Sequence, residues 1–221
     1  MASWGNVQQR LHVSNVYKPH QLLTCMRGIK RERILRVILT EEKNLSKNEL
    51  SKRACCTRQW VILFLKELEK KKLVKGTKII DPEELIRYWL TIHKKPKKYR
   101  EYMVKEPLQL LKKAKLNYAL TSYQAENFMQ RHLFPSRTDI YINEEDLEKW
   151  HSLLIKKGLY GKGNFRIIIA EEHVKYGKRK LNGIFVVSLP QLIIDLFIEG
   201  GPAAEAAELL LAKIKKHVSR I

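Results

Sequence analysis

The sequence predicts an α/β protein in two parts, a mostly helical N-terminal domain and a C-terminal domain of mixed helices and strands. Over residues 30–92, apolar residues recur mainly at helical spacing, whereas helix-like and strand-like segments alternate beyond residue 107. Between the two, residues 93–107 are basic, contain two prolines and have little hydrophobic pattern. We therefore expect an N-terminal extension (1–29), a helical domain (30–92), a basic linker (93–107) and an α/β domain (108–221).

The helical domain starts with three predicted helices. Residues 30–43 have one apolar and one charged face, which is typical of an amphipathic helix. Ser46 and Glu49 form an S-x-x-E capping box and predict a short second helix over residues 47–54. Thr57 is a favourable N-cap for a third helix that ends near Lys72.

A hairpin and a fourth helix complete this domain. The segment "LVKGTKII" predicts two short strands around Gly76, and Asp81 followed by Pro82 predicts the start of the fourth helix. The order helix, short helix, tight turn, helix and hairpin is typical of a winged helix-turn-helix domain. The sequence therefore predicts that the third helix can enter a DNA major groove.

The third helix has an outward polar face in this prediction. At 100° per residue, Gln59, Ile62, Leu63, Lys66 and Lys70 lie opposite the apolar side. An arginine in the first turn can pair with guanine and a glutamine with adenine, while lysines contact phosphates. The predicted DNA-binding residues are Lys47, Thr57, Arg58, Gln59, Lys66, Lys70, Lys75 and Lys78.

The charge of the chain supports a polyanionic partner. The formal net charge is +20, from 43 basic and 23 acidic residues. Residues 1–105 hold 25 Lys and Arg against 10 Asp and Glu, whereas residues 106–221 hold 18 against 13. A chain so far from neutrality is typical of proteins that bind nucleic acid, so we expect double-stranded DNA to bind the first half.

The C-terminal domain is predicted from alternating segments. Asn143 precedes a helix with acidic residues in its first turn and a glycine stop at Gly158, and Ser188 opens a later helix. The alanine-rich segment "PAAEAAELLLAKIKKHV" closes the chain as a helix. The other predicted helices are "LQLLKKAK" and "QAENFMQRHL", and the predicted strands are "NYALTSY", "RTDIYI", "NFRIIIAE" and "GIFVVS", the last two flanking the basic turn "KYGKRKLNG".

Several classes of protein do not fit the composition. Three cysteines, two of them adjacent, give neither a disulfide framework nor zinc-ligand spacing. No apolar run approaches 18 residues, and the polar start lacks a signal-peptide core. We expect a cytoplasmic protein without a membrane contact, a metal or another cofactor.

Two other functions use the same residues. Asp139, Glu171, Glu172 and Lys175 resemble the acid, acid, lysine set of metal-dependent nucleases of the restriction type. If residues 172–175 form a strand, Glu172 and Lys175 point to opposite faces, so we expect no catalytic site. The basic surface is also compatible with an RNA-binding factor.

Four quoted segments carry a resemblance to a known family. "DPEELIRYWL", "YALTSYQAENFM", "PSRTDIYI" and "VVSLPQLIIDLFIEGGPAAEAAELLLAKI" are similar to the AbiEi-type antitoxins of type IV toxin–antitoxin systems and their archaeal transcription-regulator relatives. The resemblance covers most of residues 30–219 and implies a DNA-binding transcription regulator whose α/β domain has a regulatory or antitoxin role. It also implies a cognate toxin or, for archaeal relatives, basal transcription factor B as a partner. The extension over residues 1–29 is longer than the family needs.

Overall fold

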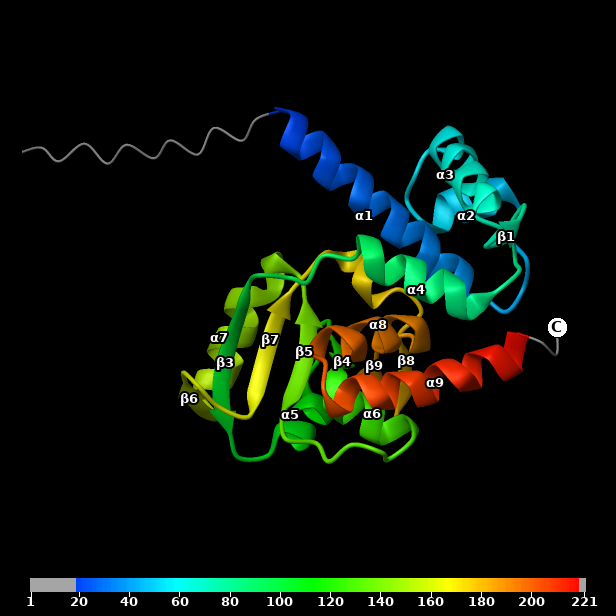
Figure 1. The fold of residues 1–221 in the computed structure, drawn as a ribbon. Coiled ribbons are helices and arrows are strands. Elements are labelled where there is room, and N and C mark those ends of the chain that lie inside the picture. Colours follow the sequence, from blue (N-terminus) through cyan, green and yellow to red (C-terminus); the bar gives the residue numbers. More distant parts are fainter. Residues whose placement is uncertain (1–18, 219–221) are drawn as a thin grey trace, which may run out of the picture.

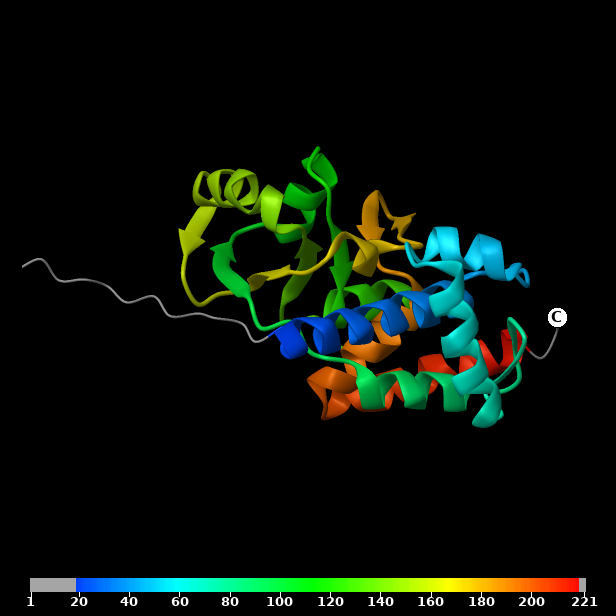
Figure 2. The same cartoon turned by 90° about the horizontal axis from the view of Figure 1, so that it is seen from above.

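The computed structural model describes the backbone of residues 19–218 and the side chains of residues 28–214. Helices gather at one end of a mixed sheet and cover both of its faces, which confirms the α/β class (Figure 1 and Figure 2). Figure 2 gives the view from above, with α1 crossing the molecule beside α4 and the sheet layer behind them. The first elements are α1 (Pro19–Thr40), α2 (Lys47–Arg53), α3 (Arg58–Lys70), β1 (Val74–Lys75), β2 (Lys78–Ile79) and α4 (Pro82–Ile92).

The larger sheet of the described chain has the order β6-β3-β7-β5-β4-β9-β8. Its strands pair antiparallel, except that β5 and β7, and β4 and β9, run parallel. A two-residue turn with Asn182 and Gly183 at positive φ joins β8 to β9, as in a tight hairpin. The strands are β3 (Tyr99–Val104), β4 (Ala119–Thr121), β5 (Thr138–Ile142), β6 (Gly158–Tyr160), β7 (Phe165–Ile169), β8 (Arg179–Leu181) and β9 (Ile184–Val186).

Helices that follow the sheet strands complete the fold. They are α5 (Pro107–Lys113), α6 (Ser122–Met129), α7 (Leu147–Ile155), α8 (Leu189–Glu199) and α9 (Pro202–Val218), with 3₁₀ turns η1 (Glu144–Asp146) and η2 (Glu172–Lys175). Within the described residues, no helix is both long and apolar enough to cross a bilayer.

The predicted helix caps are confirmed for α2, α3 and α4. Ser46 Oγ accepts a hydrogen bond from the Glu49 amide at 3.1 Å, and Thr57 Oγ1 accepts one from the Trp60 amide at 3.3 Å. Asp81 Oδ1 accepts two amide hydrogen bonds at the start of α4, at 2.9 and 3.1 Å. These contacts satisfy N–H groups that a helix start otherwise leaves without a partner.

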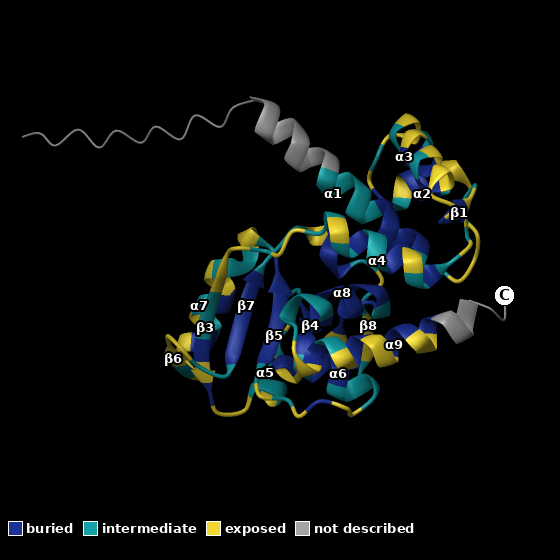
Figure 3. Cartoon of the chain, viewed as in Figure 1, coloured by how far each residue is buried: buried dark blue, intermediate teal, exposed yellow. Residues whose placement is uncertain are grey.

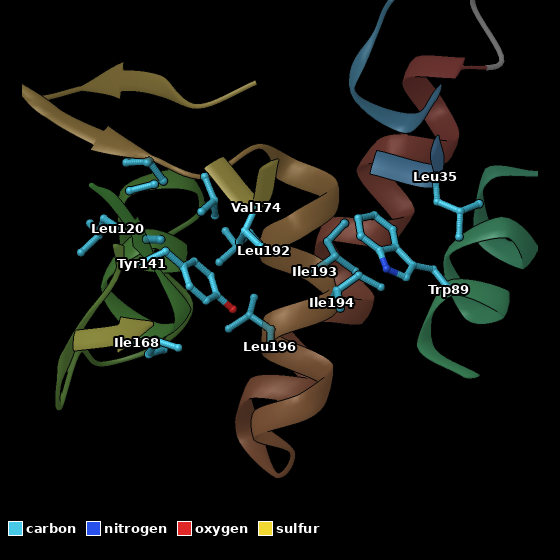
Figure 4. Close-up of a cluster of buried hydrophobic side chains, with 14 of the residues drawn as sticks. Leu35, Trp89, Leu120, Tyr141, Ile168, Val174, Leu192, Ile193, Ile194 and Leu196 are labelled. Atoms are coloured by element: carbon cyan, nitrogen blue, oxygen red, sulfur yellow. The ribbon is translucent and has the colours of Figure 1, made fainter. Parts of the chain in front are cut away.

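Helix α8 joins the two halves of the chain into one core. Its residues from Pro190 to Leu196 are all buried, so the helix is covered on every side. Figure 4 shows Leu192 and Leu196 facing Tyr141 of the sheet, while Ile193 and Ile194 face Trp89 of α4. The buried core cluster accordingly extends continuously from α1 to α9.

The segment expected to be a linker contains a strand of the sheet. Residues 99–104 form β3, which pairs with β6 on one side and β7 on the other. Tyr102 and Val104 are buried while Met103 between them is exposed, the alternation of a half-buried strand. The surrounding lysines hid this short alternation, so residues 99–104 of the segment predicted as a basic linker (93–107) belong to the sheet.

Two other element boundaries in the structure differ from the predicted ones. The segment "NYALTSY" was predicted as one strand, but β4 ends at Thr121 and α6 starts at Ser122, whose φ of +54° turns the chain out of the sheet. Helix α1 begins at Pro19, so part of the segment expected to be an N-terminal extension is helical, and residues 1–18 lie outside the described range.

Candidate nucleic-acid interface

Helix α3 lies at one end of the molecule with a polar face in solvent. Its buried residues are Val61, Phe64, Leu65 and Leu68, which pack into the core beside α1 and α2. The opposite face is exposed, and Leu63 on it is 61% exposed (Figure 3). This division follows the apolar spacing of the sequence and leaves the outer face free for a partner.

The side chains predicted to bind DNA are all exposed. They come from the start of α2, from the cap and outer face of α3, and from the hairpin β1–β2, elements that stand together away from the large sheet (Figure 1). The exposed set is Lys47, Thr57, Arg58, Gln59, Lys66, Lys70, Lys75 and Lys78. Exposure of these residues is what the sequence prediction requires.

The turn between α2 and α3 is tight and strained. Cys55 has a φ of +50°, the left-handed region that glycine adopts most easily. The Cys55 thiol is exposed, so packing of the side chain does not explain why a cysteine occupies this strained position. The turn sets the direction in which α3 leaves α2, and Thr57 then caps α3 as described above.

The hairpin is fixed to the end of α3. Glu69 Oε1 accepts a hydrogen bond from the Gly76 amide at 2.7 Å, and Gly76 has a φ of +64°, which suits glycine. Lys75 and Lys78 are directly paired across the two strands, so their side chains lie on the same face. Two adjacent lysines repel each other, and an anion such as a phosphate relieves that repulsion.

Glu67 holds α3 against two neighbouring helices. Its carboxylate accepts hydrogen bonds from Arg31 of α1 at 2.7 Å and from the Tyr88 hydroxyl of α4 at 3.0 Å. Burial and the adjacent Glu67 carboxylate raise the pKa of Tyr88 to about 12. The outer face of α3 is thus held in a fixed orientation relative to α1 and α4.

A second group of contacts holds α1 and α2 against the α/β part. The buried Arg36 guanidinium donates to Gln191 Oε1 at 2.8 Å and to His173 Nδ1 at 3.0 Å, and lies 5.3 Å from the Trp89 ring centroid. His173 Nε2 donates to the Arg53 carbonyl at 3.0 Å. Burial and the neighbouring Arg36 lower the pKa of His173 to about 4, so the imidazole is neutral.

Sequence reasoning missed this network. Arg36 lies within the apolar run of α1. The sequence of that run does not indicate which residue the Arg36 guanidinium contacts. Three more pairs connect the N-terminal helical part to the α/β part: Arg33 with Glu171 at 2.7 Å, Tyr176 with Glu41, and Arg87 of α4 with Glu208 of α9 at 3.1 Å. The one signal in the sequence was an arginine among apolar residues at helical spacing, which indicates a polar partner on the buried side of the helix.

The residues considered for a nuclease are not brought to one point. Asp139 is fully buried and accepts hydrogen bonds from Arg137 at 2.6 Å and from Arg166 at 3.0 and 3.1 Å. Glu172 and Lys175 do meet, at 2.8 Å, because residues 172–175 form a 3₁₀ turn and not the strand that was considered. Among the described residues, no group of three His, Cys, Asp or Glu side chains is placed to hold a metal ion.

Comparison of the chain with protein-family models, with curated proteins and with solved structures gave no match.

Proposed function

We propose that this protein is a sequence-specific DNA-binding transcription regulator. Helix α3 acts as the recognition helix of a winged helix-turn-helix and the hairpin β1–β2 as its wing. The observation that carries the proposal is the exposed outer face of α3, with Arg58 and Gln59 in its first turn and lysines along the rest. The order α1, α2, α3, hairpin also supports it.

The proposed contacts divide into two kinds. Arg58 and Gln59 reach base edges in the major groove, since the N-terminal residues of a recognition helix lie deepest there. Lys47, Lys66 and Lys70 contact phosphates beside the groove, and the paired lysines of the hairpin contact the flanking backbone. Leu63, which is exposed on the same face, can pack against thymine methyl groups.

The partners implied by the resemblance are part of this proposal. The C-terminal α/β part gives the chain a regulatory role, as an antitoxin beside a cognate toxin or as an activator that recruits basal transcription factor B. The contacts of Arg33 with Glu171 and of Arg36 with His173 support a regulatory coupling, because they hold α1 against the α/β part.

The test is a selection of bound sequences from a random duplex library, followed by binding curves for variants. We expect Arg58→Ala to weaken binding to the selected site by about 1–3 kcal/mol and to relax the preference at one base position. Lys66→Ala should weaken binding to all sequences alike, and Lys162→Ala, an exposed lysine on the turn before β7, is the matched control. Equal effects of all three variants would contradict the proposal, as would tighter binding to structured RNA than to duplex DNA.

A further inference from the structure

A cavity of about 480 Å³ lies where the end of α1 meets the start of α8. Thr40 at the end of α1 and Glu42 in the turn after it line one side, and Ser188 at the start of α8 lines the other. Arg179 of β8 and Lys213 of α9 also line it. The cavity therefore touches both the helix that leads into α2 and α3 and the elements of the α/β part.

Two hydroxyl groups of the lining residues have no hydrogen-bond partner. Thr40 Oγ1 and Ser188 Oγ are both buried and unpaired among the described residues, and Ser188 is only 3% exposed. Gly177 brings the two side chains to one place, since a Cβ on it would lie 2.4 Å from Thr40 Cγ2 and 3.4 Å from Ser188 Cβ. Buried polar groups are normally paired, so two unpaired hydroxyls beside one cavity indicate a polar partner inside it.

The start of α8 adds hydrogen-bond donors of its own. Ser188 is the N-cap residue of this 11-residue helix, yet its side chain accepts no hydrogen bond from a helix amide. Pro190 follows inside the first turn and has no N–H, so the amides of Leu189 and Gln191 are the donors at this helix end. A helix start carries a partial positive charge, and a carboxylate oxygen is a favourable partner for it.

Two cationic side chains at the cavity keep their charge available. The contact of the Arg179 guanidinium is with the Met129 sulfur at 3.8 Å, and a thioether is a weak, uncharged acceptor. Lys213 Nζ donates to the neutral amide oxygen of Gln130 at 3.1 Å. Neither contact neutralises the positive charge, so both side chains favour an anionic group in the cavity.

The two acidic residues of the lining differ from each other. Glu41 is occupied, because its carboxylate lies 2.5 Å from Arg53 and accepts a hydrogen bond from the Tyr176 hydroxyl. Glu42 is exposed, and no described residue forms an ion pair with it. The cavity thus presents cations and one unpaired carboxylate together, a combination that a simple anion does not match. A ligand with a positive and a negative group matches both.

The size and the apolar walls of the cavity limit the ligand further. Leu39, Leu189, Pro190 and Ile214 supply apolar lining, and the last two are buried. A water molecule takes up about 30 Å³ of the liquid, so a space of about 480 Å³ accepts far more than one bridging water. Sites for small organic ligands typically measure about 300–1,000 Å³ and combine apolar walls with a few polar groups.

We infer that this cavity binds a zwitterionic α-amino acid with an apolar side chain. The carboxylate lies at the start of α8, where the Ser188 hydroxyl and Arg179 donate to it, and the ammonium group faces Glu42. The apolar side chain packs against Leu39 and Ile214. Because the ligand contacts both α1 and α8, it stabilises their arrangement and acts as an effector of the proposed DNA binding. The effector role rests on that proposed function, whereas the binding site does not.

The experiment is isothermal titration calorimetry of the full chain without DNA, using L-leucine, L-methionine and L-phenylalanine as probes. For each probe that binds, the matched controls are its amino alcohol, which lacks the carboxylate, and its deaminated acid, which lacks the ammonium group. We expect saturable binding of at least one probe at millimolar concentration or below, and about tenfold or weaker binding of both controls.

Absence of saturable binding by all three probes would overturn the inference. Equal binding of a probe and either of its controls would do so too, because one of the two charged groups would then play no part. Since the titration contains no DNA, these results are independent of whether the chain binds DNA.

Variants locate the binding site on the chain. Arg179→Ala and Glu42→Gln should each weaken binding of the probe about tenfold, whereas Lys180→Ala, the next exposed residue of β8 and not part of the lining, should leave it unchanged. Ser188→Ala should weaken binding without lowering the temperature of thermal unfolding, because the hydroxyl makes no hydrogen bond in the fold. If Lys180→Ala weakens binding as much as Arg179→Ala, the attraction is a general surface charge and the site is refuted.

Discussion

Replacement of His173 should remove a specific dependence of stability on pH. The imidazole is neutral in the fold because it is buried, because Arg36 donates to its Nδ1, and because Arg33 adds a further positive charge nearby. Tyr176 stacks on the ring at 5.1 Å between centroids and adds no compensating negative charge. The pKa of His173 falls from an ordinary 6.5 to about 4.

The sign and size of the effect follow from these two pKa values. A lowered histidine pKa means that the unfolded chain binds the proton more tightly than the fold does. The stabilisation is therefore complete above pH 6.5 and is lost as the pH falls from 6.5 to about 4. Between pH 7 and pH 5 the loss attributable to this one group is about 2 kcal/mol.

The assay is urea unfolding of the natural chain and His173→Gln at pH 7, 6 and 5. Glutamine keeps a neutral polar side chain but does not titrate, and the other histidines are common to both proteins. We expect the difference in free energy of unfolding between the two proteins to shrink by about 2 kcal/mol from pH 7 to pH 5. A difference that is constant with pH would refute the neutral, arginine-paired imidazole.

Two further substitutions test the turn and the shared core. Cys55→Gly should raise the free energy of unfolding by up to about 1 kcal/mol, since glycine relieves the positive φ, while Cys55→Val should lower it; thermal unfolding measures both, and the opposite order would contradict the strained turn. Trp89→Ala should cost about 3–5 kcal/mol, because the ring is fully buried between α8 and Arg36. Thermal unfolding followed by fluorescence and by circular dichroism should show a single transition, which the substitution moves to lower temperature. Two separate transitions, of which the substitution moves only one, would contradict a continuous core.

Local features of the sequence were predictable because their causes are local. Thr57 and Asp81 cap helices within two or three residues of themselves, so spacing alone located α3 and α4. The outward face of α3 followed in the same way from helical periodicity. The burial of Trp89 in the core was predictable from its position on the apolar side of α4.

Features that depend on distant partners were not predictable. Strand β3 has only Tyr102 and Val104 as buried positions, and its place in the sheet depends on β6 and β7, about 60 residues away. The Arg36 network joins residues more than 130 positions apart. Asp139 looked like a metal ligand in sequence, yet Arg166 on the neighbouring strand neutralises it.

The salt dependence of DNA binding tests the central claim most directly. Five exposed lysines at Lys47, Lys66, Lys70, Lys75 and Lys78 are proposed to contact phosphates. The slope of log affinity against log salt concentration should then be roughly −4 to −5, at about 0.9 per phosphate contact. The double variant Lys66→Ala/Lys70→Ala should reduce the slope by about 2. A slope near zero, or one that the double variant leaves unchanged, would contradict the placement of α3 against DNA.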